Sequence, residues 1–253
     1  MKKVIIPISS YGFDPTETAI PWKILSENGV KVKFATPDGK KGLCDMLMLT
    51  GNNLGPLKKL LAARIDAVTA YKKMNTSAEF CNPSRYDEIE PDNYDGIFLP
   101  GGHHKGVRVY LESEYLQNTV SSFFEADKIV GAICHGVLLA AKSTNKKNGK
   151  SVLYHVKTTA LLKKQERLAY YLTKYILGEY YLTYPETTVE DEVKKALKTP
   201  ENFVYGSLPL RRDKPTQLKY GFSLRHNNYI SARWPGDIYS ITFGFLNMIK
   251  NIN

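Results

Sequence analysis

The chain has 253 residues, of which 43% are hydrophobic and 24% charged, so it is long enough to bury a core and lacks the composition of disordered proteins. Its formal net charge of +10 raises the question of nucleic-acid binding. The lysines, however, come as doublets scattered along the whole chain, with a single local basic cluster at 210–214. Because scattered doublets are typical of a solvated surface, we expect no nucleic-acid partner.

The sequence also argues against membrane and disulfide classes of protein. It contains no run of about 18 apolar residues, and the apolar stretch that follows Lys2 and Lys3 is too short for a signal peptide. Cys44, Cys81 and Cys134 form no CxxC pair and are odd in number, which argues against a disulfide framework and a zinc site. We therefore expect a soluble cytoplasmic protein with free thiols, no metal and no membrane partner.

The predicted elements alternate between short apolar runs and helical patterns. In chain order they are strands at 2–8, 30–36, 96–102 and 128–133, with helices at 14–29, 113–127 and 137–143. The run at 128–133 is continuously apolar, which favours a central strand buried on both faces. This alternation predicts an α/β fold with a doubly wound, mainly parallel sheet and helices on both faces.

Two segments are longer than such a scaffold needs. They are 43–92, with a predicted helix at 56–74, and 157–220, with predicted helices at 158–177 and 189–198. Insertions between core elements usually cover a site or form an interface. We therefore expect a single domain over 1–253 with two helical cap insertions. The chain closes with a strand, a turn and a helix over 228–250, for which Asp237 is the predicted cap.

The stretch AICHG places Cys134 directly before His135, where the strand at 128–133 meets a helix. Ala132 and Gly136 leave the space that a nucleophile elbow requires on both sides of its nucleophile. A helix N-terminus stabilises a thiolate, so we expect Cys134 to have a low pKa and to be alkylated before the other two cysteines. The alternative is a buried, unreactive cysteine, which we favour for the other two.

Two further features fall at the same predicted sheet edge. Gly101 and Gly102 end the neighbouring strand, where their backbone N–H groups and that of His135 can form an oxyanion hole. Glu17 lies at the start of the helix that follows the first strand. Its spacing from Asp14 is also that of a capping box, so capping is an alternative to a catalytic role.

Taken together, AICHG, FLPGG and ETAIPWKILSENGVKVKFATPDGK resemble the ThiJ/PfpI superfamily over residues 3–250. The resemblance implies a flavodoxin-like fold related to class I glutamine amidotransferases. The long insertions are similar to those of its larger glyoxalase III and stress-chaperone branch. Glutamine hydrolysis is not expected, because His226, the only late histidine, lacks the glutamate of that class's H-x-E pair.

The resemblance assigns roles by position. Cys134 corresponds to the nucleophile, His135 to the histidine of the triad, Glu17 to the buried acid beside the cysteine, and Gly102 to an oxyanion donor. The acidic third member of the triad corresponds to Glu166, although its lysine-rich helix would equally place Glu166 in solvent. The remaining substrate-binding positions are Gly101, Gly136 and His103, and His104 stands where the family often has glycine.

The family resemblance implies a cofactor-free cysteine enzyme that acts on small reactive carbonyls. It would be a glutathione-independent glyoxalase III, converting methylglyoxal to lactate, or a related deglycase. The Cys134 thiolate would add to the aldehyde, and Glu17 or His135 would move the proton. The alternatives are a hydrolase that uses Cys134, His135 and Glu166, and a stress chaperone or redox sensor without turnover. We expect a small-molecule carbonyl and a second copy of the chain as partners.

Overall fold

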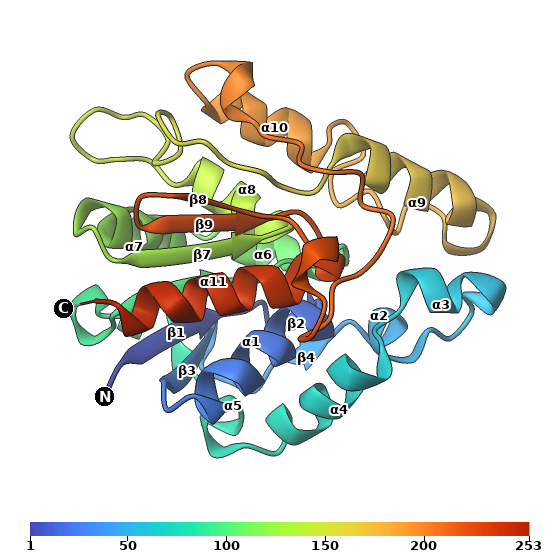
Figure 1. Cartoon of the computed structure of the whole chain (residues 1–253), viewed down its shortest axis with the longest axis horizontal. Coiled ribbons are helices and arrows are strands. Elements are labelled where there is room, and N and C mark those ends of the chain that lie inside the picture. The colour runs from blue at the N-terminus through green and yellow to red at the C-terminus, as the bar shows by residue number, and fades with distance from the viewer. Residues whose placement is uncertain (253) are drawn as a thin grey trace.

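A seven-stranded sheet forms the centre of the computed structural model, which describes residues 1–252 (Figure 1). The strand order is β5-β3-β1-β6-β7-β9-β8, and neighbouring strands are parallel except for the pair β8 and β9. Counted along the chain, the five central strands have the order 2-1-3-4-5, which is the flavodoxin-like order. The predicted α/β, mainly parallel fold is therefore confirmed.

The predicted strands are all present, with slightly narrower bounds. They are β1 (Lys3–Pro7), β3 (Lys31–Thr36), β6 (Gly96–Leu99), β7 (Ile129–Ile133) and β9 (Tyr229–Ala232). Every residue of β6, β7 and β9 is buried, because parallel strands in the middle of such a sheet are covered on both faces.

The sequence analysis missed four short strands. They are the sheet-edge strands β5 (Ser84–Arg85) and β8 (Ser223–His226), and β2 (Tyr11–Phe13) and β4 (Leu43–Cys44), which pair with each other in a separate small sheet. Strands of two to four residues are too short for an apolar pattern to stand out.

Helices cover both faces of the sheet. On one face α1 (Pro15–Glu27) packs beside α11 (Ile238–Lys250), and on the other α7 (Glu114–Glu125) packs beside α8 (His135–Lys142) (Figure 1). The remaining α-helices are α2 (Met46–Thr50), α3 (Lys58–Leu61), α4 (Ile65–Met74), α5 (Ala78–Cys81), α6 (Arg108–Leu111), α9 (Lys163–Leu177) and α10 (Val189–Ala196). No helix in residues 1–252 is both long and apolar enough to span a membrane.

The helix predicted at 56–74 is interrupted. A short 3-10 turn, η1 (Gly55–Leu57), leads into α3, and the backbone is extended at Ala62 and Arg64 before α4 begins. Tertiary contacts explain the break. The Ala63 N–H donates to the carbonyl of Met48 at 2.8 Å instead of continuing the helix.

The helix predicted at 158–177 begins five residues later, at Lys163. Thr158 instead forms a β-bridge with Phe203, and the Thr159 N–H donates to the Ser231 hydroxyl at 3.1 Å. Asp237 does occupy the N-cap position of α11, but its side chain makes no capping hydrogen bond. Its carboxylate instead pairs with the buried guanidinium of Arg233 at 2.8 Å.

The two long segments lie around the sheet in the same body as the scaffold. From 43–92, α4 packs on α1, and from 157–220, α10 packs on α8. Helices α2, α3 and α9 lie beyond the sheet on the side away from the two termini (Figure 1). The carboxyl ends of the parallel strands face this side, where open α/β sheets place their ligands.

Candidate active site

Cys134 occupies a strained turn between β7 and α8. Its backbone angles, φ 57° and ψ −126°, fall outside the regions that non-glycine residues usually adopt, at a cost of about 1–3 kcal/mol. The turn requires glycine at 136, because a Cβ there would lie 2.0 Å from the carbonyl oxygen of Leu99. Gly136 therefore allows α8 to begin close against β6.

His135 is the first residue of α8 and is fully buried. Its Nδ1 lies 3.4 Å from the Cys134 sulfur. Its Nε2 is buried and has no hydrogen-bond partner within residues 1–252. Burial, followed by the neighbouring His103, holds the pKa of His135 well below its usual value. A neutral imidazole beside the thiol is therefore the resting state.

Glu17 is fully buried at the start of α1, and its contacts separate the capping role from the catalytic one. The cap is made by Asp14, whose Oδ1 accepts from the N–H groups of Thr16 at 2.7 Å and Glu17 at 2.9 Å. The Glu17 carboxylate does not accept a hydrogen bond from the Asp14 N–H in return, so the capping box is incomplete. Its Oε2 accepts from the Gly101 N–H at 2.8 Å, and its Oε1 is buried without a partner in the described chain.

Burial raises the pKa of Glu17 well above its usual value, and the nearby Asp14 carboxylate raises it further. Burial also raises the pKa of Asp14 itself, to about 6. Burial in the folded protein therefore favours the protonated form of the Glu17 carboxyl. A carboxyl in this condition is a strong base whenever it does ionise, and it can also give its proton back.

Glu17, Cys134 and His135 converge on Gly101. A Cβ at this glycine would lie 2.6 Å from the His135 backbone nitrogen, 3.0 Å from Glu17 Oε2 and 3.1 Å from Cys134 Cβ. The Gly101 N–H is already bound to Glu17. The expectation that it is free to bind a substrate oxygen is therefore wrong.

Gly102 is the better placed of the two glycines for an oxyanion. Its N–H makes no hydrogen bond within the described chain. Its φ of 154° lies in the region that favours glycine, and a Cβ would lie 2.7 Å from the carbonyl oxygen of Gly12. The backbone of Gly102 can therefore be held in this position only by a residue without a side chain.

The expected low pKa of Cys134 is not found. Burial raises the pKa of the thiol well above its usual value, and the carboxylates of Glu17 and Asp14 raise it further. The backbone N–H of His135 acts in the opposite direction but is outweighed. Cys134 is also only 1% exposed, whereas Cys81 is exposed at the surface. Both facts contradict the expectation that Cys134 is alkylated first.

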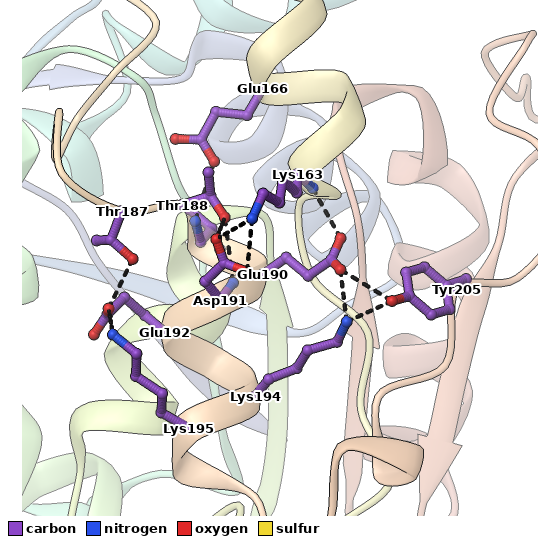
Figure 2. A network of polar contacts seen from close by, with 11 residues as sticks. Lys163, Glu166, Thr187, Thr188, Glu190, Asp191, Glu192, Lys194, Lys195 and Tyr205 are labelled. Carbon is purple, nitrogen blue, oxygen red and sulfur yellow. Dashed lines mark hydrogen bonds and ion pairs between the residues drawn. The ribbon is translucent and has the colours of Figure 1, made fainter.

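Glu166 is buried in the first turn of α9, so the alternative that placed it in solvent is wrong. It faces the N-terminal end of α10 (Figure 2), where its Oε2 accepts from the Val189 N–H at 3.1 Å. Burial raises its pKa to about 7. Because His135 Nε2 has no partner, the structure does not join Glu166 to His135 by a hydrogen bond.

The surroundings of Glu166 are a network that fastens α9 to α10 (Figure 2). The Lys163 N–H donates to Glu190 Oε2 at 2.9 Å, and its ammonium pairs with Asp191 at 2.9 Å. Lys194 pairs with Glu190 at 2.7 Å. The position of Glu166 is therefore explained by helix packing in this structure.

A cavity of about 140 Å³ borders the reactive residues through His103 and Asp14. The His103 ring meets the rings of His135 and Tyr181 edge to face, with centroids 5.0 and 4.9 Å apart. Burial lowers the pKa of His103 to about 4, so its ring is neutral. Both long segments supply walls of this cavity, through Met48, Leu60, Leu61, Leu161, Gln165, Leu168, Ala169, Leu172, Tyr181, Pro209 and Arg212.

Sequence reasoning missed Gln165, Tyr181, Arg212 and Trp234 as residues of this cavity. They come from separate parts of the chain, and no local motif marks them. A larger hollow of about 600 Å³ lies elsewhere, lined in part by Met1, Gly29 and Lys31, and contains none of the reactive residues. No three histidine, cysteine or acidic side chains within residues 1–252 are grouped to hold a metal ion.

Comparison with known proteins shows the family of the chain. A sequence model described as ThiJ/PfpI family-like matches residues 8–200. The chain is 25% identical over 153 residues to the glutathione-independent glyoxalase hsp3102 of Schizosaccharomyces pombe, covering 60% of each protein. It is 22% identical over 170 residues to glyoxalase 3 of Candida albicans, covering 63% of this chain and 68% of that protein.

Among solved structures, that of glyoxalase III from Candida albicans superposes on this chain with a TM-score of 0.67. The two are 16% identical, and the superposition covers 98% of this chain and 97% of the other. At this identity the likeness establishes a shared fold. It extends over the long segments as well as the sheet, because it covers nearly the whole of both chains.

Proposed function

The chain belongs to the ThiJ/PfpI family, which includes glyoxalases, and on this premise we propose that it is a cysteine enzyme that converts 2-oxoaldehydes such as methylglyoxal to 2-hydroxy acids without glutathione. The observation that carries the proposal is the convergence on Gly101 of a strained cysteine, a buried histidine and a buried glutamate. The names of the relatives support the same class of substrate.

The first step is addition of the thiol to the aldehyde. The Cys134 sulfur bonds to the aldehyde carbon while His135 Nδ1, 3.4 Å away, takes the thiol proton. A neutral base is needed because the resting thiol is protonated. The developing oxyanion accepts a hydrogen bond from the Gly102 N–H. It then receives the proton from His135, which gives a neutral hemithioacetal.

The second step moves hydrogen between the two adjacent carbons. Glu17, in its ionised form, removes the proton from the former aldehyde carbon to give an enediolate, and then returns it to the neighbouring carbon. The hydroxyl proton of the hemithioacetal passes to the oxygen of the former ketone. The product is the thioester of a 2-hydroxy acid, an isomer of the hemithioacetal. Water then cleaves the thioester, which releases the 2-hydroxy acid and restores the thiol.

The hydrolase alternative receives less support. A Cys-His-Glu triad needs an acidic partner for His135, and Glu166 is bound to the Val189 N–H instead. The chaperone alternative has one observation in its favour. Helix α9 exposes Tyr171, Tyr175 and Ile176 by 59%, 92% and 64%, an apolar surface of the kind that binds unfolded chains. Such an activity would not need Cys134, so Cys134→Ser separates it from catalysis.

The test of the proposed function is formation of lactate from methylglyoxal without glutathione. Wild-type protein should form lactate, and Cys134→Ser should lose roughly all turnover above background. Cys81→Ser is the matched control because Cys81 is exposed and distant in sequence from the turn, and it should keep wild-type activity. Absence of lactate with wild-type protein, or full activity in Cys134→Ser, would reject the proposed function.

A further inference from the structure

The cavity beside His103 contains three buried polar atoms without partners. They are His103 Nδ1, Gln165 Oε1 and Trp234 Nε1, and none has a hydrogen bond within residues 1–252. Buried polar atoms in native proteins are nearly always paired. Three unpaired atoms around one cavity of about 140 Å³ therefore indicate that a ligand completes their hydrogen bonds.

The hydrogen-bonding capacity of these three atoms indicates which polar groups the ligand carries. The Gln165 oxygen accepts hydrogen bonds. Burial lowers the pKa of His103 to about 4, and Nδ1 of this neutral ring accepts or donates according to the tautomer. The Trp234 N–H can only donate. The cavity thus offers an acceptor, a donor and one ring nitrogen that can serve as either, which suits a small polar group that carries both N–H or O–H and C=O.

The residues that line the cavity indicate the size and polarity of the rest of the ligand. Most of the lining is apolar and not aromatic, from Met48, Leu60, Leu61, Leu161, Leu168, Ala169, Leu172, Pro209 and Pro235. A cavity of roughly 150 Å³ is large enough for a benzene ring. An isobutyl or phenyl group therefore fits this cavity, whereas the methyl group of methylglyoxal would leave most of it empty.

The charges at the cavity favour an uncharged ligand. The Arg212 guanidinium donates to the carbonyl of Leu60 at 2.7 Å and lies over the Trp234 ring at 5.4 Å. The Asp14 carboxyl is already engaged as the cap of α1. One nitrogen of the cation and one oxygen of the acid are therefore already bound, and the two side chains are opposite in sign.

The cavity is close to the nucleophile. His103 lines it and is in edge-to-face contact with His135, whose Nδ1 lies 3.4 Å from the Cys134 sulfur. The His103 ring therefore lies between the cavity and the reactive residues, none of which lines the cavity itself.

We propose that this cavity is the subsite for the substituent of the substrate, and that the preferred substrate is a 2-oxoaldehyde with a branched aliphatic or aromatic group in place of the methyl group of methylglyoxal. This inference rests on the proposed function for its chemistry. The hydroxyl group of the hemithioacetal and the oxygens of the substrate supply the donors and acceptors that His103, Gln165 and Trp234 lack.

The kinetic test compares isobutylglyoxal with methylglyoxal. Wild-type protein should have a kcat/KM for isobutylglyoxal at least about 10-fold higher, the lower end of what an added methylene contributes in an apolar pocket. Ala169→Leu fills part of the cavity and should lower this value about 10-fold or more, while methylglyoxal turnover changes less than about twofold. Tyr175→Leu introduces the same residue on the exposed side of α9 and should change neither.

A ratio of the two kcat/KM values that is the same in wild type and Ala169→Leu would overturn the proposal. Gln165→Leu is a second variant of similar size that removes one acceptor, and it should also lower turnover of isobutylglyoxal. Retained methylglyoxal turnover shows that Ala169→Leu is folded, so its loss confined to isobutylglyoxal belongs to the cavity. An unchanged melting temperature shows that Gln165→Leu is folded, because the hydrogen bond it removes is available to both substrates.

A binding measurement separates failure of the subsite from failure of the proposed function. Isovaleramide carries the same isobutyl group on an unreactive amide with two N–H donors and one C=O acceptor. Calorimetry should show binding to wild type, about 10-fold weaker binding to Ala169→Leu and unchanged binding to Tyr175→Leu. If neither aldehyde is converted, this pattern of binding supports the proposed subsite and rejects the proposed reaction. No binding, or equal binding to all three proteins, rejects the subsite.

Discussion

Replacing Glu17 by glutamine separates its catalytic role from a structural one. Glutamine has nearly the same shape, and its side-chain carbonyl can accept the 2.8 Å hydrogen bond from the Gly101 N–H. It cannot ionise, however, and so cannot take a proton from carbon. The cap of α1 is untouched, because Asp14 supplies it.

The structure allows the size of both effects to be worked out. Leaving a buried N–H unpaired costs about 1–3 kcal/mol, and since glutamine keeps the bond we expect a stability change within about 1 kcal/mol at pH 5. The pKa of Glu17 is raised in the folded protein, so ionisation of Glu17 destabilises wild type as the pH rises above 4.5. Glutamine does not ionise, so the variant does not lose this contribution to stability. Turnover should fall roughly 100-fold or more, the usual contribution of a positioned acid-base group.

The assay combines thermal unfolding at pH 5 and pH 8 with lactate formation from methylglyoxal. The variant should gain stability relative to wild type between these two pH values and should lose turnover at both. Glu27→Gln, at the exposed end of the same helix, is the matched control and should behave as wild type. A folded Glu17→Gln protein with undiminished turnover would refute the role of Glu17 and leave His135 as the proton carrier.

Three further predictions concern other parts of the structure. Burial raises the pKa of Glu166 from 4.5 to about 7. Wild type should therefore lose about 3 kcal/mol more stability between pH 4 and pH 8 than Glu166→Gln. Equal losses of the two proteins in urea titrations would contradict this prediction. Iodoacetamide should label exposed Cys81 before buried Cys134, and peptide mapping that finds the reverse order would count against the buried thiol. Gly136→Ala places a methyl group 2.0 Å from the Leu99 carbonyl oxygen, so it should destabilise the protein by about 3 kcal/mol or more, and a variant as stable as wild type would disprove the close approach.

The sheet could be predicted from the sequence because its strands and helices carry their own signals. The runs at 4–8 and 129–133 are apolar throughout, and Gly29 marks the end of α1. These signals depend only on residues that are adjacent in the sequence. The helix expected at 56–74 failed for the opposite reason, since a hydrogen bond from Ala63 to the distant Met48 breaks it.

The positions of the candidate site residues were predictable, but their electrostatics were not. The positions of Cys134, His135 and Glu17 follow from where the strands end, which the sequence indicates. Their pKa values depend on burial, which brings the Cys134 thiol to 1% exposure and encloses two carboxyls, Asp14 and Glu17, beside it. The backbone N–H of His135, at the start of the helix, lowers the pKa of Cys134 by less than burial raises it.

The capping-box spacing of Asp14 and Glu17 illustrates the limit of a local motif. Asp14 does cap α1. The Glu17 carboxylate does not complete the capping box, because it accepts from the N–H of Gly101, which is far away in the sequence. The cavity residues Gln165 and Trp234 were not predictable at all, because only the packing of two distant segments brings them together.

The account rests on a covalent bond between the Cys134 sulfur and the substrate carbon, and rapid acid quenching followed by peptide mass spectrometry tests it most directly. During the first turnover, the peptide that contains Cys134 should gain the mass of one methylglyoxal molecule, because the hemithioacetal and the thioester are isomers. The adduct should decay as lactate appears, and it should accumulate as the hemithioacetal in Glu17→Gln. Lactate formation with no adduct on Cys134 at any time would contradict the account.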